Sequence, residues 1–373
     1  MDNNNQSIIF PAYAKISFTL ITIALIVVFM YFGQQILLPL LLSLLLAILL
    51  RPVVVFLNLK IRIPHVIAVL LAVILFVLIV SSVVFFVSWK VSDITDDWQQ
   101  IKTNFFLHYK HLQQWIKLNY NMSYNQQQGY VEQIKNETFS SDRNLMGSTL
   151  NSFTSTLVNV VLIPIYTFLI LLYRKLFVEF LYKVVSEKNK TTLVEVLNQV
   201  NVVVHSYIVG LFIELIVVAT LTTTGFLILG VKYALLLGVI TAVLNLIPYI
   251  GILAAGLISI FATLGNSTDV SIIAGIIVVN SLVQLIDNNI IVPKIVGNKV
   301  RINALVTMVG VIIAGSIWGV SGMVLSIPIT AILKVIFDHS EPLKPIGFLL
   351  GNPEPIAKST LLTKVLNIKL KSK

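Results

Sequence analysis

Long apolar runs without charged residues alternate along this chain with short segments that carry most of its charge. A helix needs about 20 apolar residues to cross the ~30 Å hydrocarbon core of a bilayer. The run at residues 36–50 rises only about 22 Å, so its helix either continues through residues 53–57 or lies beside a thinned part of the bilayer. The first five runs predict membrane-crossing helices near residues 16–32, 36–57, 64–89, 145–173 and 202–229.

Two later runs are longer than one crossing requires. Residues 233–268 and residues 302–333 contain no charged side chain, yet both are interrupted by helix-breaking residues. The interruptions are Pro248 and Gly251 in the first run, and Gly315, Gly319 and Gly322 in the second. Each run therefore forms either one overlong tilted helix or a re-entrant hairpin whose tip lies within the membrane.

The charged segment between these runs, residues 287–301, favours one alternative. It contains three bases and one acid, and basic loops are enriched on the cytoplasmic side of a membrane. Single crossings would place this segment outside the cell, whereas two hairpins place it inside with the other basic loops. We therefore expect an all-α integral membrane protein with about six full transmembrane helices, two re-entrant or broken helical hairpins, and both termini in the cytoplasm.

A polar stripe marks the apolar segment that precedes this charged loop. At 100° per residue, Asn280, Gln284 and Asp287 lie within about 60° of one another on a helix. Polar groups are expensive to bury in lipid, so the stripe should face protein, a water-filled path or a ligand. Broken helices at membrane depth are likewise tolerated where they line a cavity. The two broken runs and the striped helix together predict a substrate or ion pathway.

Two acids stand out because they fall inside apolar segments. Glu214 lies in the middle of the fifth run, and an acid there is a candidate proton carrier or ligand. It could instead form a structural ion pair, for which the basic candidates are Lys232, Arg301 and His205. Asp287 could serve in transport or form a fixed salt bridge with Lys294, which lies seven residues on along the same helical face.

The composition changes completely between residues 90 and 143. This segment mixes polar and aromatic residues at helical spacing, and it carries nearly balanced charge. We interpret it as an extramembrane arm of amphipathic helices on the outer side. The expected organisation is N-terminal membrane helices at 1–89, the arm at 90–143, two membrane helices with a cytoplasmic helix at 144–232, a transport core at 233–336 and a basic cytoplasmic tail at 337–373.

The composition is that of an integral membrane protein. The chain of 373 residues is 57% hydrophobic and 11% charged, with a mean hydropathy of +0.93, whereas soluble domains are about 25% charged. The net charge of +10 is scattered over loops and the tail, so it favours membrane orientation over nucleic-acid binding. The chain has no Walker loop, HExxH or GxSxG motif, and we expect no catalysis, cofactor or metal site.

Three segments carry a resemblance to a known family. They are NLIPYIG at 245–251, QLIDNNIIVPKIVG at 284–297, which contains Asn288, and GSIWGVSGMVLSIPITAILKVI at 315–336. In order and spacing they resemble the AI-2E transporters, also called the PerM family. The resemblance adds Asn245 and Asn288 to the candidate pathway. The sequence departs from the family pattern at Ile252 and Ala304, where proline is usual.

The resemblance implies a secondary transporter in the cytoplasmic membrane that exports a small polar solute or signalling molecule such as autoinducer-2, with a bearing on quorum sensing. Some relatives are described as sodium/proton antiporters, which is the alternative. A structural membrane protein whose arm binds partners is a third hypothesis. The expected partners are a small polar solute or ion and the lipid bilayer, and the resemblance also implies a homo-oligomer.

Overall fold

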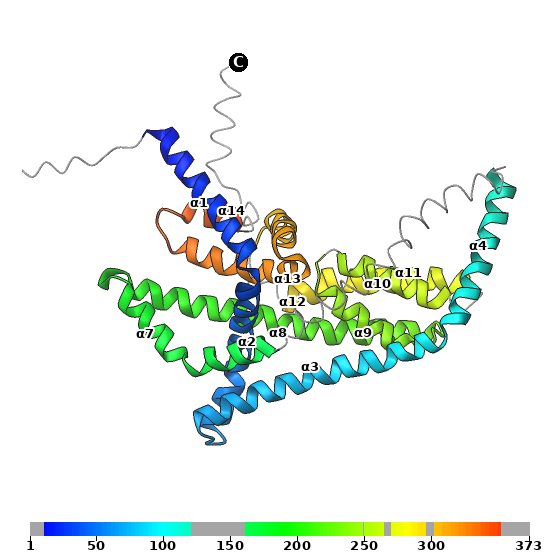
Figure 1. Ribbon diagram of the computed structural model, residues 1–373, viewed down its shortest axis with the longest axis horizontal. Helices are drawn as coiled ribbons and strands as arrows, with labels where there is room; N and C mark the ends of the chain where they lie inside the picture. The colour runs from blue at the N-terminus through cyan, green and yellow to red at the C-terminus, as the bar shows by residue number, and fades with distance from the viewer. Residues whose placement is uncertain (1–10, 121–160, 249, 265–269, 296–301, 352–373) are drawn as a thin grey trace, which may run out of the picture.

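The computed structural model describes residues 11–120, 161–248, 250–264, 270–295 and 302–351, which are almost entirely helical (Figure 1). Within these ranges, the one extended pairing is an isolated antiparallel bridge between Ile302 and Gly351. The predicted all-α class is therefore confirmed. Five described helices are long and apolar enough to cross a membrane, or six if a bent pair at residues 161–184 forms one span.

The first three helices follow the apolar runs closely. They are α1 (Ala12–Phe32), α2 (Gln34–Leu59) and α3 (His65–Asp96). Helix α2 continues past residue 50, which is the first of the two alternatives for its run. Helix α3 runs beyond the end of its apolar run at residue 89, and α4 (Trp98–Tyr120) begins only after it. Of the predicted arm, α4 lies in the described part of the chain, and residues 121–143 lie outside it.

The charged segment at residues 174–195, which carries five bases and three acids, predicts one amphipathic helix after the fourth apolar run, but the chain bends there and forms two helices. The helix Val161–Leu172 meets α7 (Arg174–Val184) at 63°. A short 3₁₀ turn, η2 (Glu187–Asn189), leads into α8 (Lys190–Ile228). Helix α7 is thus shorter than expected, because residues 190–195 already belong to the 39-residue helix that carries Glu214.

The run at residues 233–268 folds back on itself. It forms α9 (Ala234–Asn245) and α10 (Ile250–Leu264), which pack against each other. The reversal is so tight that a Cβ at Gly251 would lie 1.8 Å from the carbonyl oxygen of Leu244. Glycine is required there, and the alternative of a single tilted helix is wrong for this run.

The run at residues 302–333 also doubles back, within α13 (Ala304–Asp338). Gly319 adopts φ 60° and ψ −145°, a backbone conformation available to glycine and strained for other residues. Beyond it, a Cβ at Gly322 would lie 2.0 Å from the carbonyl oxygen of Ala314. The length of α13 therefore does not correspond to one crossing. Helix α14 (Lys344–Leu350) packs beside the two ends of α13. There the backbone N–H of Asn303 donates to the Leu350 carbonyl at 2.9 Å.

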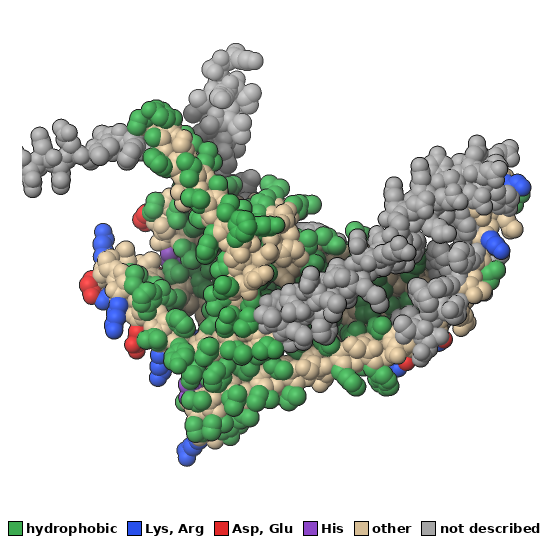
Figure 2. All heavy atoms as spheres, viewed as in Figure 1, with side chains coloured by type: hydrophobic (Ala, Val, Ile, Leu, Met, Phe, Trp, Pro, Cys, Tyr) green, Lys and Arg blue, Asp and Glu red, His purple; other side chains and the backbone are tan. Residues whose placement is uncertain are grey.

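Four helices form a closed ring that positions the polar residues. Helix α11 (Val270–Ile286) packs on α10 and α8, and α9 packs on α8 and α10 (Figure 1). On the face seen in Figure 2, apolar side chains cover much of the surface between the ends of the helices, while charged side chains gather near α7 and α4, with basic ones at the α2–α3 corner. This distribution suits long helices embedded in a bilayer with charged ends in water.

One ion pair fastens α4 to the ring. Asp97, at the α3–α4 junction, accepts hydrogen bonds from the Lys232 ammonium and the Tyr233 hydroxyl, which precede α9. These two bonds hold the pKa of Asp97 below its usual value of 3.8, because both stabilise the ionised carboxylate.

We predict that Asp97→Asn lowers the thermal unfolding temperature in detergent at neutral pH. A group whose pKa is lower in the folded state stabilises the fold above its usual pKa, and this contribution fades as the pH falls through the folded value. The difference between wild type and variant should therefore shrink below about pH 4. Asp93→Asn, in the half-buried pair with Lys90 within one helix, is the control and should have a smaller effect, because that pair joins no separate elements. An equal loss in both variants would contradict a specific role for Asp97.

We also predict that Gly322→Ala destabilises the second hairpin by about 1–3 kcal/mol, because the added methyl overlaps a backbone carbonyl. Gly310→Ala is the matched control, since its Cβ would lie at an ordinary 3.5 Å from Thr330 Oγ1. The measurement is thermal unfolding of both purified variants. Equal stability of the two variants would show that the reversal tolerates a side chain.

Candidate functional site

Two buried carboxylates share one side-chain amide at the reversal of the first hairpin, between α9 and α10. The Nδ2 atom of Asn245 donates to Glu214 Oε1 at 2.9 Å and to Asp287 Oδ2 at 3.2 Å. Asn245 is the last residue of α9, Glu214 lies midway along α8, and Asp287 follows α11. Three elements far apart in sequence therefore meet at one side chain.

The two acids are removed from solvent. Glu214 is 7% exposed and Asp287 is 3% exposed, and Asp287 Oδ1 has no hydrogen-bond partner in the structure. Neither carboxylate forms an ion pair with a described base.

The ionic partners considered for Glu214 from the sequence do not pair with it. Lys232 pairs with Asp97, the Nδ1 atom of His205 is buried without a hydrogen bond, and Arg301 lies outside the described residues. The partner that the structure gives Glu214 is the amide of Asn245.

The proposed bridge between Asp287 and Lys294 is also absent. Lys294 is exposed at the end of α12 (Val292–Ile295). Asp287 opens a five-residue π-helical segment, η3 (Asp287–Ile291), which changes the turn between the two residues. Such π segments are rare and often lie at functional sites. The changed turn removes the shared face on which the bridge depended.

The predicted polar stripe divides into a buried part and an exposed part. Asn280 is 7% exposed and faces the ring with Asp287. Gln284 is half-buried and donates to Asn288 Oδ1 at 3.1 Å, on the exposed side of the helix. The structure therefore brings Asn280 and Asp287 to the ring interior, and it leaves Gln284 and Asn288 outside it.

The broken elements are placed differently from one another. Pro248 and Gly251 lie at the reversal directly after Asn245, beside the carboxylates. Gly315, Gly319 and Gly322 lie at the reversal of α13. A Cβ at Gly315 or at Gly322 would meet other residues of α13 itself. There the Trp318 indole donates to the Met30 carbonyl at 2.9 Å, a contact that no sequence pattern indicated.

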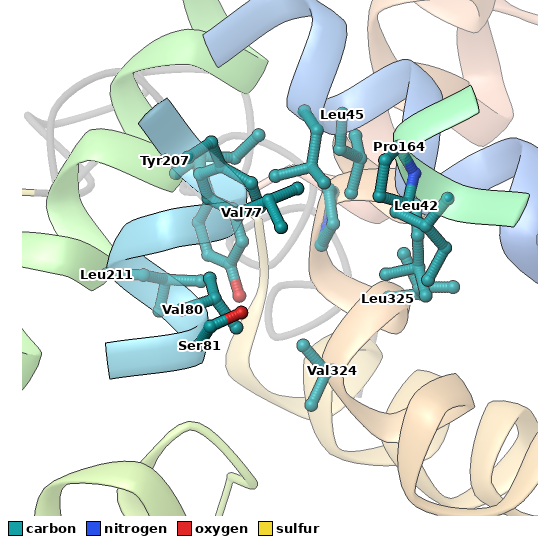
Figure 3. A pocket seen from close by; sticks show the side chains of 15 residues that line it. Leu42, Leu45, Val77, Val80, Ser81, Pro164, Tyr207, Leu211, Val324 and Leu325 are labelled. Carbon is teal, nitrogen blue, oxygen red and sulfur yellow. The ribbon is translucent and has the colours of Figure 1, made fainter. Parts of the chain in front are cut away.

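A separate cavity of about 340 Å³ lies between α2, α3, α8, α13 and the helix at 161–172 (Figure 3). Its lining is apolar apart from Tyr207 and Ser81, whose hydroxyl groups face the same side of the cavity in Figure 3. A polar solute would lose most of its hydration there and could gain hydrogen bonds from only these two side chains. The cavity is therefore poorly suited to a polar substrate.

The electrostatics of the carboxylate pair limit what the site can do. Both oxygens contact the same nitrogen, so they are at most about 6 Å apart, and two full negative charges at that distance repel by roughly 3 kcal/mol at an effective dielectric of 20. One amide can satisfy one oxygen of each acid, but it brings no positive charge. A proton or a small cation between the acids would remove the repulsion. The described residues contain no group of three or more metal-binding side chains.

Comparison with known proteins places the chain among transporters. A model of the AI-2E family transporters matches residues 20–341. The chain is 28% identical over 194 residues to "Putative transport protein YueF" of Bacillus subtilis, covering 51% of this chain and 52% of that protein. It is 26% identical over 185 residues to "Putative permease PerM" of Escherichia coli, covering 50% and 52%.

These matched stretches span about half the length of each relative. The family model, in contrast, includes every helix from α2 to α13 and both hairpins. The multi-pass helical fold agrees with a membrane-embedded permease. The match over residues 20–341 shows that this chain belongs to the AI-2E family of transporters.

Proposed function

We propose that the protein is a secondary transporter that couples movement of a small polar solute to a proton or monovalent cation held between Glu214 and Asp287. One observation carries this proposal: two buried carboxylates share a neutral amide and have no basic partner among the described residues. A buried acid without a base binds a proton or cation more readily than it stays ionised alone. Reversible binding there provides a coupling step.

Export of a signalling solute such as autoinducer-2 from the cytoplasm is the first candidate, and it follows from the family. Exchange of sodium for protons is the second, and the geometry favours it specifically. A carboxylate pair bridged by a single amide binds either a proton or an oxygen-seeking cation, and the two compete for the same oxygens. When a proton and a sodium ion compete for one site, binding of one releases the other, which is one requirement for antiport.

We further propose that both helical hairpins are re-entrant, with their tips inside the membrane and residues 287–301 on the cytoplasmic side. The tight reversals at Gly251 and Gly319 support this arrangement. So does the basic loop between the hairpins, by the positive-inside rule. In this proposal the protein lies in the cytoplasmic membrane of the cell. Both termini are in the cytoplasm, and α4 is on the outer side.

We predict that Asp287→Asn and Glu214→Gln each abolish coupled flux in proteoliposomes while leaving folding intact, because each removes a charge and preserves size. Solute and sodium flux, and proton movement on adding sodium, are measured under imposed gradients. Asp93→Asn and Glu341→Gln make the same changes in ion pairs away from the ring interior, and they should transport normally. Normal flux in Asp287→Asn would remove the carboxylate pair from the mechanism. Absence of any flux in wild type would favour a structural role.

The topology has its own test, since the chain has no cysteine. Lys294→Cys should resist an impermeant thiol reagent in intact cells and react after lysis. Leu118→Cys, at an 83% exposed position on α4, should react from outside. Labelling of Lys294→Cys in intact cells would refute the re-entrant arrangement.

A further inference from the structure

The ring of α8, α9, α10 and α11 holds a second group of polar side chains apart from the carboxylates. Each member has a buried oxygen that lacks a hydrogen-bond partner in the structure. The atoms are Thr222 Oγ1, Thr223 Oγ1, Ser259 Oγ and Asn280 Oδ1. Thr222 is 0% exposed, Ser259 1% and Asn280 7%.

Packing contacts establish the register between α8 and α11. Val218 and Val283 belong to one buried cluster. Further along, a Cβ at Gly225 would lie 2.5 Å from Val279 Cγ1. As the residue number rises on α8, it falls on α11, so the two helices are antiparallel.

This register brings Thr222 and Asn280 to the same level. Thr222 lies two turns beyond Glu214, a rise of about 12 Å, and Asn280 lies two turns before Asp287, about 10 Å. Because the helices are antiparallel, both rises point in the same direction, towards the C-terminal end of α8. The second polar group therefore lies two turns from the carboxylate pair.

The other two helices complete this level. A Cβ built at Gly238 of α9 would lie 2.1 Å from Thr223 Oγ1, so the hydroxyl occupies the space beside that glycine. A Cβ built at Gly256 of α10 would lie 3.6 Å from Asn280 Nδ2. Ser259 lies one turn after Gly256, on the same side of α10.

The missing hydrogen bonds set these hydroxyls apart from others in the same helices. A helical Thr or Ser usually donates to the carbonyl one turn earlier. Thr220, Thr224, Thr241 and Thr263 all do so, at 2.7–2.8 Å. Thr222, Thr223 and Ser259 forgo that partner although their hydroxyl oxygens are buried, and an unsatisfied buried polar group is unfavourable.

We propose that Thr222, Thr223, Ser259 and Asn280 form a polar station that holds water, and that the ion bound by the carboxylates exchanges through it with the end of the ring near Lys232. A buried water typically makes two to four hydrogen bonds to groups that lack other partners. Three hydroxyls and an amide oxygen supply donors and acceptors for that purpose. The route of the ion rests on the proposed function, whereas the water site does not.

The first test measures access to the station without transport. Ser259→Cys is reconstituted in liposomes and exposed briefly to silver ion, a small monovalent cation that binds thiolate. Excess silver is removed, the protein is denatured, and the remaining free thiol is labelled with a maleimide dye. Ile276→Cys, at a 0% exposed position in an apolar cluster of α11, is the dry control. We expect silver to block labelling of Ser259→Cys several-fold more than labelling of Ile276→Cys. Equal labelling of the two would show that the station is dry and would overturn the proposal.

The second test separates this proposal from the carboxylate mechanism. Thr222→Val keeps the side-chain shape and removes only the hydroxyl, and Thr220→Val is its control on the exposed side of α8. We expect several-fold slower coupled flux in Thr222→Val and unchanged flux in Thr220→Val. Normal flux in Thr222→Val, together with lost flux in Asp287→Asn, would overturn the station as part of the route and leave the carboxylate proposal intact. Silver access to Ser259→Cys together with normal flux in Asp287→Asn would support the water site and overturn the carboxylate mechanism.

Discussion

The arrangement of the polar core depends on the two hydrogen bonds that Asn245 donates from one amide nitrogen. To reach both acids, α9 must end between α8 and α11, and Pro248 cannot continue the helix because it lacks an amide hydrogen. The reversal that follows, made possible at Gly251, returns the chain as α10 against α11. The break between α9 and α10 therefore also sets the position from which Asn245 contacts both carboxylates.

The two hairpins share a backbone device but differ in their surroundings. The first lies in the ring and presents polar groups to its interior. The second packs on α8, α2, α14 and α1, borders the apolar cavity through Val324, Leu325 and Pro328, and hydrogen bonds α1 through Trp318. The proposed ion site therefore belongs to the first hairpin, while the second hairpin packs against α1 and α14 as well as α2 and α8.

Sequence periodicity predicted part of the site, for a geometric reason. Asn280 and Asp287 are seven residues apart, which is 700° of helical rotation, so they differ by only about 20°. Gln284 is offset from them by about 40° and 60° on one side, enough to carry it to the exposed edge beside Asn288. The buried acids were recognisable from their apolar surroundings. Their shared amide was not, because Asn245 meets them only through a reversal whose direction no local pattern specifies.

Helix boundaries show the same limit. The end of α2 followed from the length needed to span a bilayer, whereas α3 continued to Asp96 because polar residues after Trp89 do not end a helix. The loss of the expected bridge between Asp287 and Lys294 arose from the π-helical segment η3. A heptad spacing places two residues on one face only while the helix remains regular.

Close packing of the ring limits what can move through it. Gly225, Gly238 and Gly256 each face a side chain from a neighbouring helix, so the four helices approach one another closely. A proton or a partly dehydrated cation would need far less separation of these helices to reach the carboxylates than a larger solute would. Passage of a solute the size of a small sugar would require the first hairpin to move away from α8 or α11. Because Asn245 belongs to that hairpin and joins the two acids, such a movement would also break the ion site, so solute passage and ion release would be coupled by the same displacement.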